Sequence, residues 1–336
     1  MKKTDNPNLS DIANTLGISK MTVSRVLRGG SGFSDATKEK VLREVERVGY
    51  VPDRIAAAFG RAKSSTLIGI CLPRLTSPLF ASVADTLSAT FLRLVYQTMI
   101  GTHNHSPEEE EAWLRNFASW KPAAVVLAAR NHSPSTGKLL RSLGIPVAEI
   151  WDLTTKPFDL AIGFSHYDNG YEMARLMVDA GHKAIGYVGA LSAFPGASGH
   201  IRRRGFADGL AALGADLVAQ EIVHGTPGFY AGFVGTETLL ARRRQLDAIY
   251  FQDDEMAIGG LAYLTKVGLR VPEDIGIAGW GGLEAAAILP KRLTTTVIPT
   301  ARLAKLAAEA VVARLSGDAA QDVILIETRL ARGSTI

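Results

Sequence analysis

The chain has 336 residues, 47% of them hydrophobic, which is more than one typical domain and enough for a large buried core. Its first residues, MKKTDNPNLSD, contain no apolar stretch. No later run approaches the roughly 18 apolar residues of a membrane span, so we expect a cytoplasmic protein. The single cysteine, Cys71, excludes an internal disulfide and a cysteine-based zinc site, and its setting in STLIGICLP predicts a buried strand.

The positive charge is concentrated near the N-terminus. Residues 1–63 contain 12 Lys and Arg against 7 Asp and Glu, whereas the remaining 273 residues contain 25 and 26. A basic segment followed by a near-neutral body is typical of a nucleic-acid-binding domain joined to a domain with another task. A chance excess of surface lysine is the alternative that charge by itself leaves open.

Three short helices are predicted in this basic segment. Asn8 is suited to cap a helix over LSDIANTL, and Gly17 ends it, because glycine adopts the left-handed backbone conformation without steric cost. Ser19 caps a second helix over KMTVSRVLR, and Ser34 opens a third that runs to about Val48. Two helices joined by so short a turn form a helix-turn-helix. The side chains expected to face its core are Leu9, Ile12, Ala13, Leu16, Val23, Val26, Leu27, Val41, Leu42, Val45 and Val48.

The second helix of such a domain enters the DNA major groove with its N-terminal residues. Its outward face here would present Lys20, Met21 and Arg25. Arg25 offers a donor fork to a guanine edge, and Met21 offers apolar contact to a thymine methyl. An ordinary three-helix surface with capping hydroxyls is the alternative. Hydroxyls suited to phosphate oxygens belong to Ser19, Thr22, Ser24 and Ser34.

The segments LSDIANTLGISKMTVSRVLRG and GYVPDRIAAAF resemble the LacI/GalR family of bacterial transcription regulators, and KMTVSR with LPRLTSPLFASV is most similar to its gluconate-repressor branch. The resemblance extends over nearly all of the chain. It implies that residues 52–60 are a hinge that becomes helical on operator DNA and pushes an apolar side chain, here Phe59, into the minor groove. Phe59 replaces the usual leucine and Asp53 the usual asparagine; a plain linker is the alternative. Further expected DNA contacts are Arg28, Thr37, Tyr50, Arg54 and Ala56.

From Ser65 onward, short apolar runs alternate with helical stretches, which predicts parallel sheets covered by helices on both faces. Some 270 residues of this pattern are too many for one sheet, so we expect two α/β lobes. The runs are TLIGICLP, AAVVLAA, IPVAEIW, LAIGFS, AIGYVGA, DAIYFQ and IGIAGWG.

The resemblance implies a type I periplasmic-binding-protein-like fold for this body. The expected fold class is therefore an N-terminal all-α helix-turn-helix domain followed by a two-lobed α/β domain with parallel sheets. The expected divisions are a headpiece at 1–51, a hinge helix or linker at 52–64 and the two-lobed domain at 65–336. Its first lobe would comprise about 65–163 and 298–326, and its second about 164–297 and 327–336.

Polar and aromatic residues follow the predicted strands, at the carboxyl ends where open α/β sheets bind ligands. In two facing lobes those ends border a cleft that can close on a small molecule. The resemblance adds Arg202 as an effector-binding arginine, Tyr230 as an aromatic that stacks on the effector, and Asp253 where many members have asparagine. A solvated loop position is the alternative for each residue alone. The candidates are Arg74, Thr76, Phe80, Arg130, His132, Trp151, His166, Arg202, Tyr230, Asp253 and Trp280.

The charge of these candidates favours an acidic effector. Gly281 falls where sugar-binding members of the family often have an aspartate that grips sugar hydroxyls. That carboxylate is missing while Arg74, Arg130 and Arg202 are present, and arginine forks suit carboxylates. We therefore expect a sugar acid such as gluconate.

Other patterns lack the partners that chemistry requires. FSHYD places Ser165, His166 and Asp168 side by side without a G-x-S-x-G elbow, and is interpreted as a helix start. His103 and His105 could share a strand face as metal ligands, but no third ligand has a recognisable spacing. No Walker P-loop or G-x-G-x-x-G occurs. We expect no catalytic residue, cofactor or metal.

The predicted function is a DNA-binding transcriptional repressor with a small-molecule effector. It would act in the cytoplasm on the nucleoid, as a homodimer or tetramer on near-palindromic operator DNA. One alternative is a solute-binding protein for transport, which would need export and has no use for the basic segment. The other is a sugar-acid enzyme using the α/β body, which would need a catalytic constellation.

Overall fold

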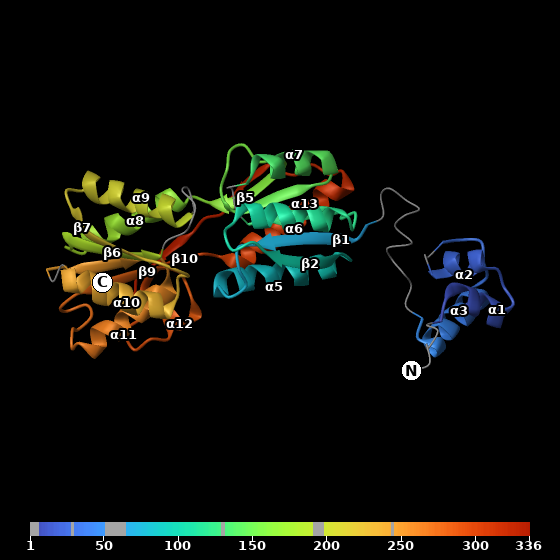
Figure 1. Cartoon of the computed structure of the whole chain (residues 1–336), viewed down its shortest axis with the longest axis horizontal. Coiled ribbons are helices and arrows are strands. Elements are labelled where there is room, and N and C mark those ends of the chain that lie inside the picture. Colours follow the sequence, from blue (N-terminus) through green and yellow to red (C-terminus); the bar gives the residue numbers. More distant parts are fainter. Residues whose placement is uncertain (1–6, 28–29, 51–64, 129–131, 191–197, 243–244) are drawn as a thin grey trace. The chain divides into compact units, whose positions relative to one another are not determined.

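The computed structural model describes residues 7–27, 30–50, 65–128, 132–190, 198–242 and 245–336. The chain divides into two compact units, Met1–Ser64 and Ser65–Ile336, which we call the head and the body. Figure 1 shows the elements of both. Each unit has a hydrophobic core of its own.

Three helices build the described part of the head, and each begins at the predicted capping residue. The side-chain oxygens of Asn8, Ser19 and Ser34 accept hydrogen bonds from backbone N–H groups of the first helical turn, at 2.8, 3.0 and 3.2 Å. Gly17 ends the first helix with φ at +65°, as predicted. The helices are α1 (Leu9–Leu16), α2 (Lys20–Leu27) and α3 (Asp35–Val48).

The three helices of the head pack on one small apolar core. Ile12, Val23 and Val41 are buried at its centre. Leu42 is 46% exposed, so the prediction that it faces inward is wrong. The inward positions of α3 recur at Val41 and every three or four residues thereafter, and Leu42 lies about 100° around the helix from that stripe.

Two six-stranded sheets form the described part of the body. The first has the order β11-β5-β4-β3-β1-β2, and all its strands are parallel. The second has the order β12-β10-β9-β8-β6-β7 and is parallel except for β12. The first-sheet strands are β1 (Leu67–Leu72), β2 (Gln97–Thr102), β3 (Ala124–Leu127), β4 (Val147–Asp152), β5 (Leu160–Phe164) and β11 (Val323–Leu325). The second-sheet strands are β6 (Ala184–Ala190), β7 (Asp216–Val223), β8 (Ala248–Phe251), β9 (Gly276–Gly281), β10 (Thr294–Val297) and β12 (Arg329–Ala331).

Helices cover both faces of each sheet, as the near-continuous apolar strands predicted. On the first sheet, α5 (Pro78–Arg93) and α13 (Thr300–Ser316) pack on one face, while α6 (Pro107–Ala118) and α7 (Pro134–Leu143) pack on the other. On the second sheet, α8 (His166–Asp179) and α9 (Ser198–Ala212) lie opposite α10 (Phe229–Arg242) and α11 (Asp254–Lys266). The short helix α12 (Glu284–Ala287) follows β9.

Each sheet with its helices forms one lobe, and the chain passes between the lobes three times in the described ranges: after β5, after β10 and after β11. The first lobe therefore combines β1–β5 with α13 and β11, and the second combines β6–β10 with β12. This is the predicted fold class, a helix-turn-helix domain followed by a two-lobed parallel α/β domain of the type I periplasmic-binding-protein kind.

Cys71 is fully buried in β1, in agreement with its sequence setting. Burial raises the pKa of its thiol, which keeps it protonated and unreactive. Within the described ranges, no helix has both the length and the apolarity to cross a membrane.

Candidate DNA-binding surface and effector cavity

The outward face of α2 carries two exposed cations beside an exposed apolar side chain. Met21 is 66% exposed, and Lys20 and Arg25 are exposed beside it. Within the described residues no ion pair joins Lys20 or Arg25 to a carboxylate, whereas Arg47 on α3 pairs with Glu44 at 2.6 Å. The cations of α2 are therefore available to base edges and phosphates, on the helix that a helix-turn-helix places in the major groove.

The predicted phosphate-binding hydroxyls lie at the starts of α2 and α3. Ser19 and Thr22 share a hydrogen bond of 2.9 Å between their hydroxyls, and Ser34 and Thr37 do the same. All four are exposed or half-buried, and Ser24 is half-buried. Tyr50 packs against the core of the head. The other predicted DNA-contacting residues lie outside the described residues: Arg28, Arg54, Ala56 and Phe59, together with Asp53.

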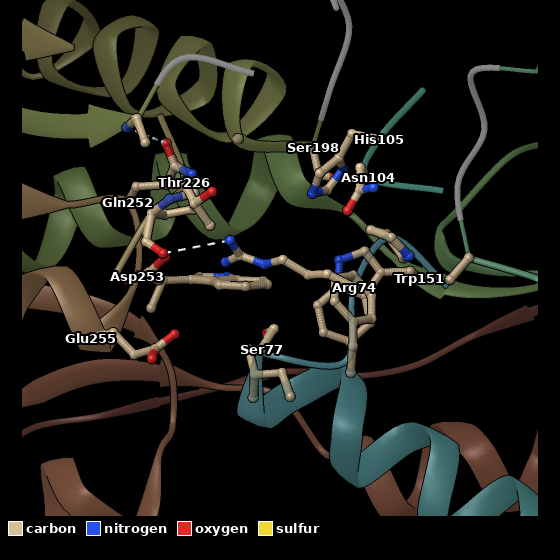
Figure 2. Close-up of a pocket in the computed structure, with 18 of the residues that line it drawn as sticks. Arg74, Ser77, Asn104, His105, Trp151, Ser198, Thr226, Gln252, Asp253 and Glu255 are labelled. Atoms are coloured by element: carbon tan, nitrogen blue, oxygen red, sulfur yellow. Dashed lines mark hydrogen bonds between the residues drawn. The ribbon is translucent and has the colours of Figure 1, made fainter. Parts of the chain in front are cut away.

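A cavity of about 360 Å³ lies between the two lobes of the body, a volume within the range of small-molecule sites. Its walls are built from residues that follow parallel strands of both sheets at their carboxyl ends, where the sequence predicted them. Figure 2 shows Trp151 and Asp253 on opposite sides of it. The predicted effector-binding residues that line the cavity are Arg74, Phe80, Trp151, Arg202, Asp253 and Trp280.

Three aromatic rings form an apolar wall of this cavity. The ring centroids of Phe80 and Trp151 lie 4.6 Å apart, and Trp151 meets Trp280 edge to face at 5.8 Å. Each ring comes from a different segment: the start of α5, the end of β4 and β9. Because the three rings brace one another, they offer a ligand a preformed apolar surface.

Arg202 is buried in α9 and held by three contacts. Its guanidinium stacks 3.8 Å above the Trp280 ring and donates to the Gln252 carbonyl at 2.6 Å. It also donates to His166 Nδ1 at 2.9 Å. Since arginine only donates, His166 is neutral with its proton on Nε2, which faces Asp152 at 3.2 Å. His166 therefore positions the Arg202 guanidinium through this hydrogen bond and does not itself line the cavity.

Arg74 follows β1 and is half-buried at the cavity. Its Nη1 donates a long hydrogen bond of 3.5 Å to the Pro227 carbonyl of the second lobe. Its buried Nε has no acceptor in the described part of the chain, and no described carboxylate lies within ion-pair distance of it. A guanidinium in this state is suited to bind an anion.

The acidic residues after β8 are largely engaged by the fold. Asp253 caps α11 by accepting the Met256 backbone N–H at 2.8 Å. Asp254 is fully buried and accepts from Thr295 Oγ1 at 2.6 Å and from Leu283 N at 2.8 Å. Burial raises the pKa of Asp253 and lifts that of Asp254 to about 6. These contacts hold the segment in place, and among the described residues neither Asp253 nor Asp254 forms an ion pair with Arg74.

Besides His166, three described residues that were predicted to bind the effector do not line this cavity: Tyr230, Thr76 and His132. Tyr230 is 79% exposed in the first turn of α10, beside a separate shallow depression. Thr76 is exposed and does not line the cavity. His132 is buried between Glu110 and Glu149. Arg130 lies outside the described residues.

The cavity also contains residues that the sequence prediction missed. Several follow β2, a half-exposed edge strand whose mixed pattern was not among the predicted apolar runs. The polar cluster THNHSP after it was the signal that could have revealed them. The missed lining residues include His103, Asn104, His105, Glu110, Ser198 and Gln252.

The structure accounts for two other sequence patterns. Ser165 Oγ accepts the Asp168 backbone N–H at 3.1 Å and caps α8, which confirms the interpretation as a helix start. His103 and His105 lie near each other, with ring centroids 6.3 Å apart. Among the described residues, no group of three or more His, Cys, Asp or Glu could hold a metal ion.

Comparison with known proteins assigns the chain to a family. Residues 8–53 match the model of bacterial regulatory proteins of the lacI family, and residues 174–336 match a periplasmic binding protein-like domain. The HTH-type transcriptional regulator GntR of Escherichia coli K12 is 32% identical over 321 residues, covering 95% of this chain and 94% of that protein. IdnR of the same strain, also an HTH-type transcriptional regulator, is 26% identical and covers 98% of each chain.

Solved structures agree in fold. A LacI-family transcriptional regulator from Silicibacter pomeroyi superposes with a TM-score of 0.91 at 32% identity, covering 98% of this chain and 99% of that one. The Lac repressor dimer bound to operator and an anti-inducer superposes with a TM-score of 0.85 at 22% identity, covering 98% and 99%. With its helix-turn-helix head, its two-lobed body and these relatives, the chain belongs to the LacI family of DNA-binding transcriptional regulators.

Proposed function

We propose that the chain is a repressor whose operator affinity is set by a sugar-acid effector bound in the cavity between the lobes. The observation that carries the choice of an acid is Arg74, a cavity-lining guanidinium with no carboxylate partner in the described residues. Arg202 adds a second cation on the opposite lobe. The resemblance of KMTVSR and LPRLTSPLFASV to the gluconate-repressor branch supports the same choice, and the HTH-type transcriptional regulator GntR of Escherichia coli K12 is 32% identical to the chain.

On DNA, we propose that two heads of a homodimer read the halves of a near-palindromic operator. The exposed Lys20, Met21 and Arg25 of α2 would contact bases, and the hydroxyls at the starts of α2 and α3 would contact phosphates. The Lac repressor, which shares the fold, is described as a dimer bound to operator. Residues 52–60, with Phe59 as a minor-groove wedge, would join each head to its body.

Ligand binding would change DNA affinity through the lobes. Contacts already cross the cavity from lobe to lobe: Arg74 reaches the Pro227 carbonyl at 3.5 Å, and Ser198 Oγ donates to Asp152 Oδ2 at 2.9 Å. A ligand that touches both walls favours the lobe arrangement in which all its contacts are made. A dimer couples that arrangement to the spacing of its two heads.

Isothermal titration calorimetry tests the effector class. Full-length protein should bind D-gluconate more tightly than D-glucose, and Arg74→Met should weaken the gluconate complex at least tenfold, about 1.4 kcal/mol. Arg302→Met, which removes an exposed arginine outside the cavity, is the matched control and should change nothing. Tighter binding of glucose than of gluconate would rule out the sugar-acid proposal.

Gel retardation tests the regulatory function. Fragments from upstream of the gene should be retarded specifically by the full chain, with an affinity that falls steeply as salt rises, because phosphate contacts release counterions. Gluconate should change that affinity in one direction or the other. No specific retardation with or without ligand would remove the operator-binding proposal.

A further inference from the structure

Three buried ionisable side chains of the first lobe form a continuous polar line. Glu149 of β4, His132 and Glu110 of α6 are each at least nine-tenths buried. His132 Nδ1 lies 2.6 Å from Glu110 Oε1, and its Nε2 lies 3.4 Å from Glu149 Oε1. The imidazole is thus held between two carboxylates, which raise its pKa to about 9 against the opposing effect of burial.

One acceptor at the end of this line remains without a donor. Glu149 Oε2 accepts the backbone N–H of Phe158 at 2.7 Å, and both nitrogens of His132 face a carboxylate. Glu110 uses Oε1 for His132, but its Oε2 is buried and receives no hydrogen bond from the described residues. Glu110 lines the cavity. Burying a carboxylate oxygen that accepts no hydrogen bond costs free energy. We therefore expect Glu110 Oε2 to accept a hydrogen bond from a group bound in the cavity.

His103 reaches the same cavity from the end of β2 and is only 2% exposed. Neither ring nitrogen has a hydrogen bond of ordinary geometry among the described residues, although the backbone carbonyl of Ala128 lies close enough to favour the protonated ring. Burial lowers the pKa of His103, so its ring is neutral and has one donor and one acceptor nitrogen. His103 therefore complements a group that both donates and accepts.

The chemistry of these two residues selects among ligand groups. A ligand carboxylate would be repelled by Glu110, and an apolar group would leave both residues unsatisfied. A hydroxyl donates to the Glu110 oxygen and exchanges a further hydrogen bond with His103. Arg74, His103 and His105 all line the cavity, and the cationic Arg74 adds to the effect of burial in lowering the pKa of His105. A molecule that carries a carboxylate and neighbouring hydroxyls thus matches the first-lobe wall as a whole.

We propose that Glu110 and His103 form a hydroxyl-recognition subsite for the polyol part of the effector, with His132 and Glu149 as positioning residues behind it. The subsite rests on the proposed function in that it takes the cavity to be the effector site. It goes further by assigning the hydroxyls of the ligand to two residues and its carboxylate to Arg74. His132, predicted to touch the effector itself, acts instead by holding Glu110.

Calorimetry with three probes separates the two parts of the ligand. D-gluconate has both a carboxylate and hydroxyls, D-glucitol has hydroxyls alone, and hexanoate has a carboxylate alone. His103→Phe removes both ring nitrogens and keeps an aromatic ring, while Glu110→Gln keeps an acceptor for His132 and turns the other position into a donor. Both variants should bind gluconate and glucitol at least tenfold more weakly than the wild type, with unchanged affinity for hexanoate. His224→Phe, at an exposed histidine outside the cavity, is the matched control.

The outcomes distinguish failure of the subsite from failure of the sugar-acid proposal. Unchanged affinities for gluconate and glucitol in both variants, with apo melting temperatures equal to the wild type, would overturn the subsite and leave the sugar-acid proposal standing. Binding of glucitol but not gluconate, with the predicted losses in the variants, would support the subsite and refute the acid. A wild type that binds neither polyhydroxy probe would refute both. The pH dependence of gluconate affinity checks His132: it should weaken as pH rises through about 9 in the wild type and stay flat in His132→Gln.

Discussion

The buried cation at His132 makes a sharp prediction about stability. The side chain is 6% exposed and lies between two carboxylates, and its folded-state pKa is about 9 against an ordinary value of 6.5. Because the folded-state pKa is the higher one, the imidazolium stabilises the fold fully below pH 6.5. This contribution is lost as the pH rises through about 9.

The magnitude follows from the displacement of that pKa. A change from 6.5 to about 9 corresponds to about 3 kcal/mol, since one pH unit is worth about 1.4 kcal/mol. Most of this is lost between pH 6.5 and 9, so the free energy of unfolding should fall by about 2–3 kcal/mol over that interval. The interval lies above the pKa of Asp254, about 6, so that carboxyl contributes little to the slope.

Urea denaturation followed by tryptophan fluorescence measures this slope. The wild type should lose stability from pH 6.5 to 9, whereas His132→Gln, which has no titrating group at this position, should be flatter by about 2–3 kcal/mol. The comparison also removes the contribution of Cys71, whose ionisation on unfolding affects both proteins alike. Parallel pH profiles for the two proteins would refute the assignment of a protonated His132 between Glu110 and Glu149.

Three further changes test other parts of the molecule. Arg25→Ala should weaken operator binding by about 1–3 kcal/mol in fluorescence anisotropy, and an unchanged affinity would show that Arg25 reads no base. Gly205→Ala should cost about 2–3 kcal/mol of stability in chemical denaturation, because its Cβ would lie 2.0 Å from the Tyr167 carbonyl oxygen where α8 and α9 pack closely. Gly228→Ala, with no neighbour within 4 Å of a Cβ, is its control and should be neutral. Asn8→Ala should lower the stability of the head by about 1 kcal/mol in thermal unfolding, since it removes the cap of α1; an unaltered melting curve would contradict this.

The helices of the head follow from signals within a few residues of each boundary. Asn8, Ser19 and Ser34 cap the helices and Gly17 ends the first, all as predicted, because a cap is a hydrogen bond between near neighbours. The one misplaced core residue, Leu42, shows the limit of apolarity as a guide. The packing of α3 against its partners selects which stripe of the helix is buried.

Some strands could likewise be predicted from local sequence, and others could not. Runs that are buried on both faces, such as β1, β4 and β9, were visible as continuous apolar segments. The edge strands β2 and β7 are half-exposed and mixed in composition, and β10 is a run of threonines that becomes buried only between its neighbours. Their pairing depends on where the rest of the sheet lies.

Some residues of the cavity could be identified from the sequence, and others depend on how the helices pack. The rule that ligand groups follow parallel strands identified Arg74, Trp151 and Asp253 from the sequence, since strand ends are local features. The family resemblance, and not this rule, proposed Tyr230 as a stacking aromatic. In the structure Tyr230 is exposed on α10 and does not line the cavity, because the direction of a side chain on that helix depends on how the helix packs.

Glu110 could not have been found from the sequence, because it lies in a run of four glutamates whose members are chemically alike. Only the packing of α6 on the first sheet buries Glu110 beside His132 and leaves its neighbours in the helix more exposed. The sequence determined the kinds of groups that this protein possesses and the local turns that order them. Which of those groups share a dry, low-dielectric space was decided by contacts between residues far apart in the chain, and burial is what gives a carboxylate or an imidazole its functional character.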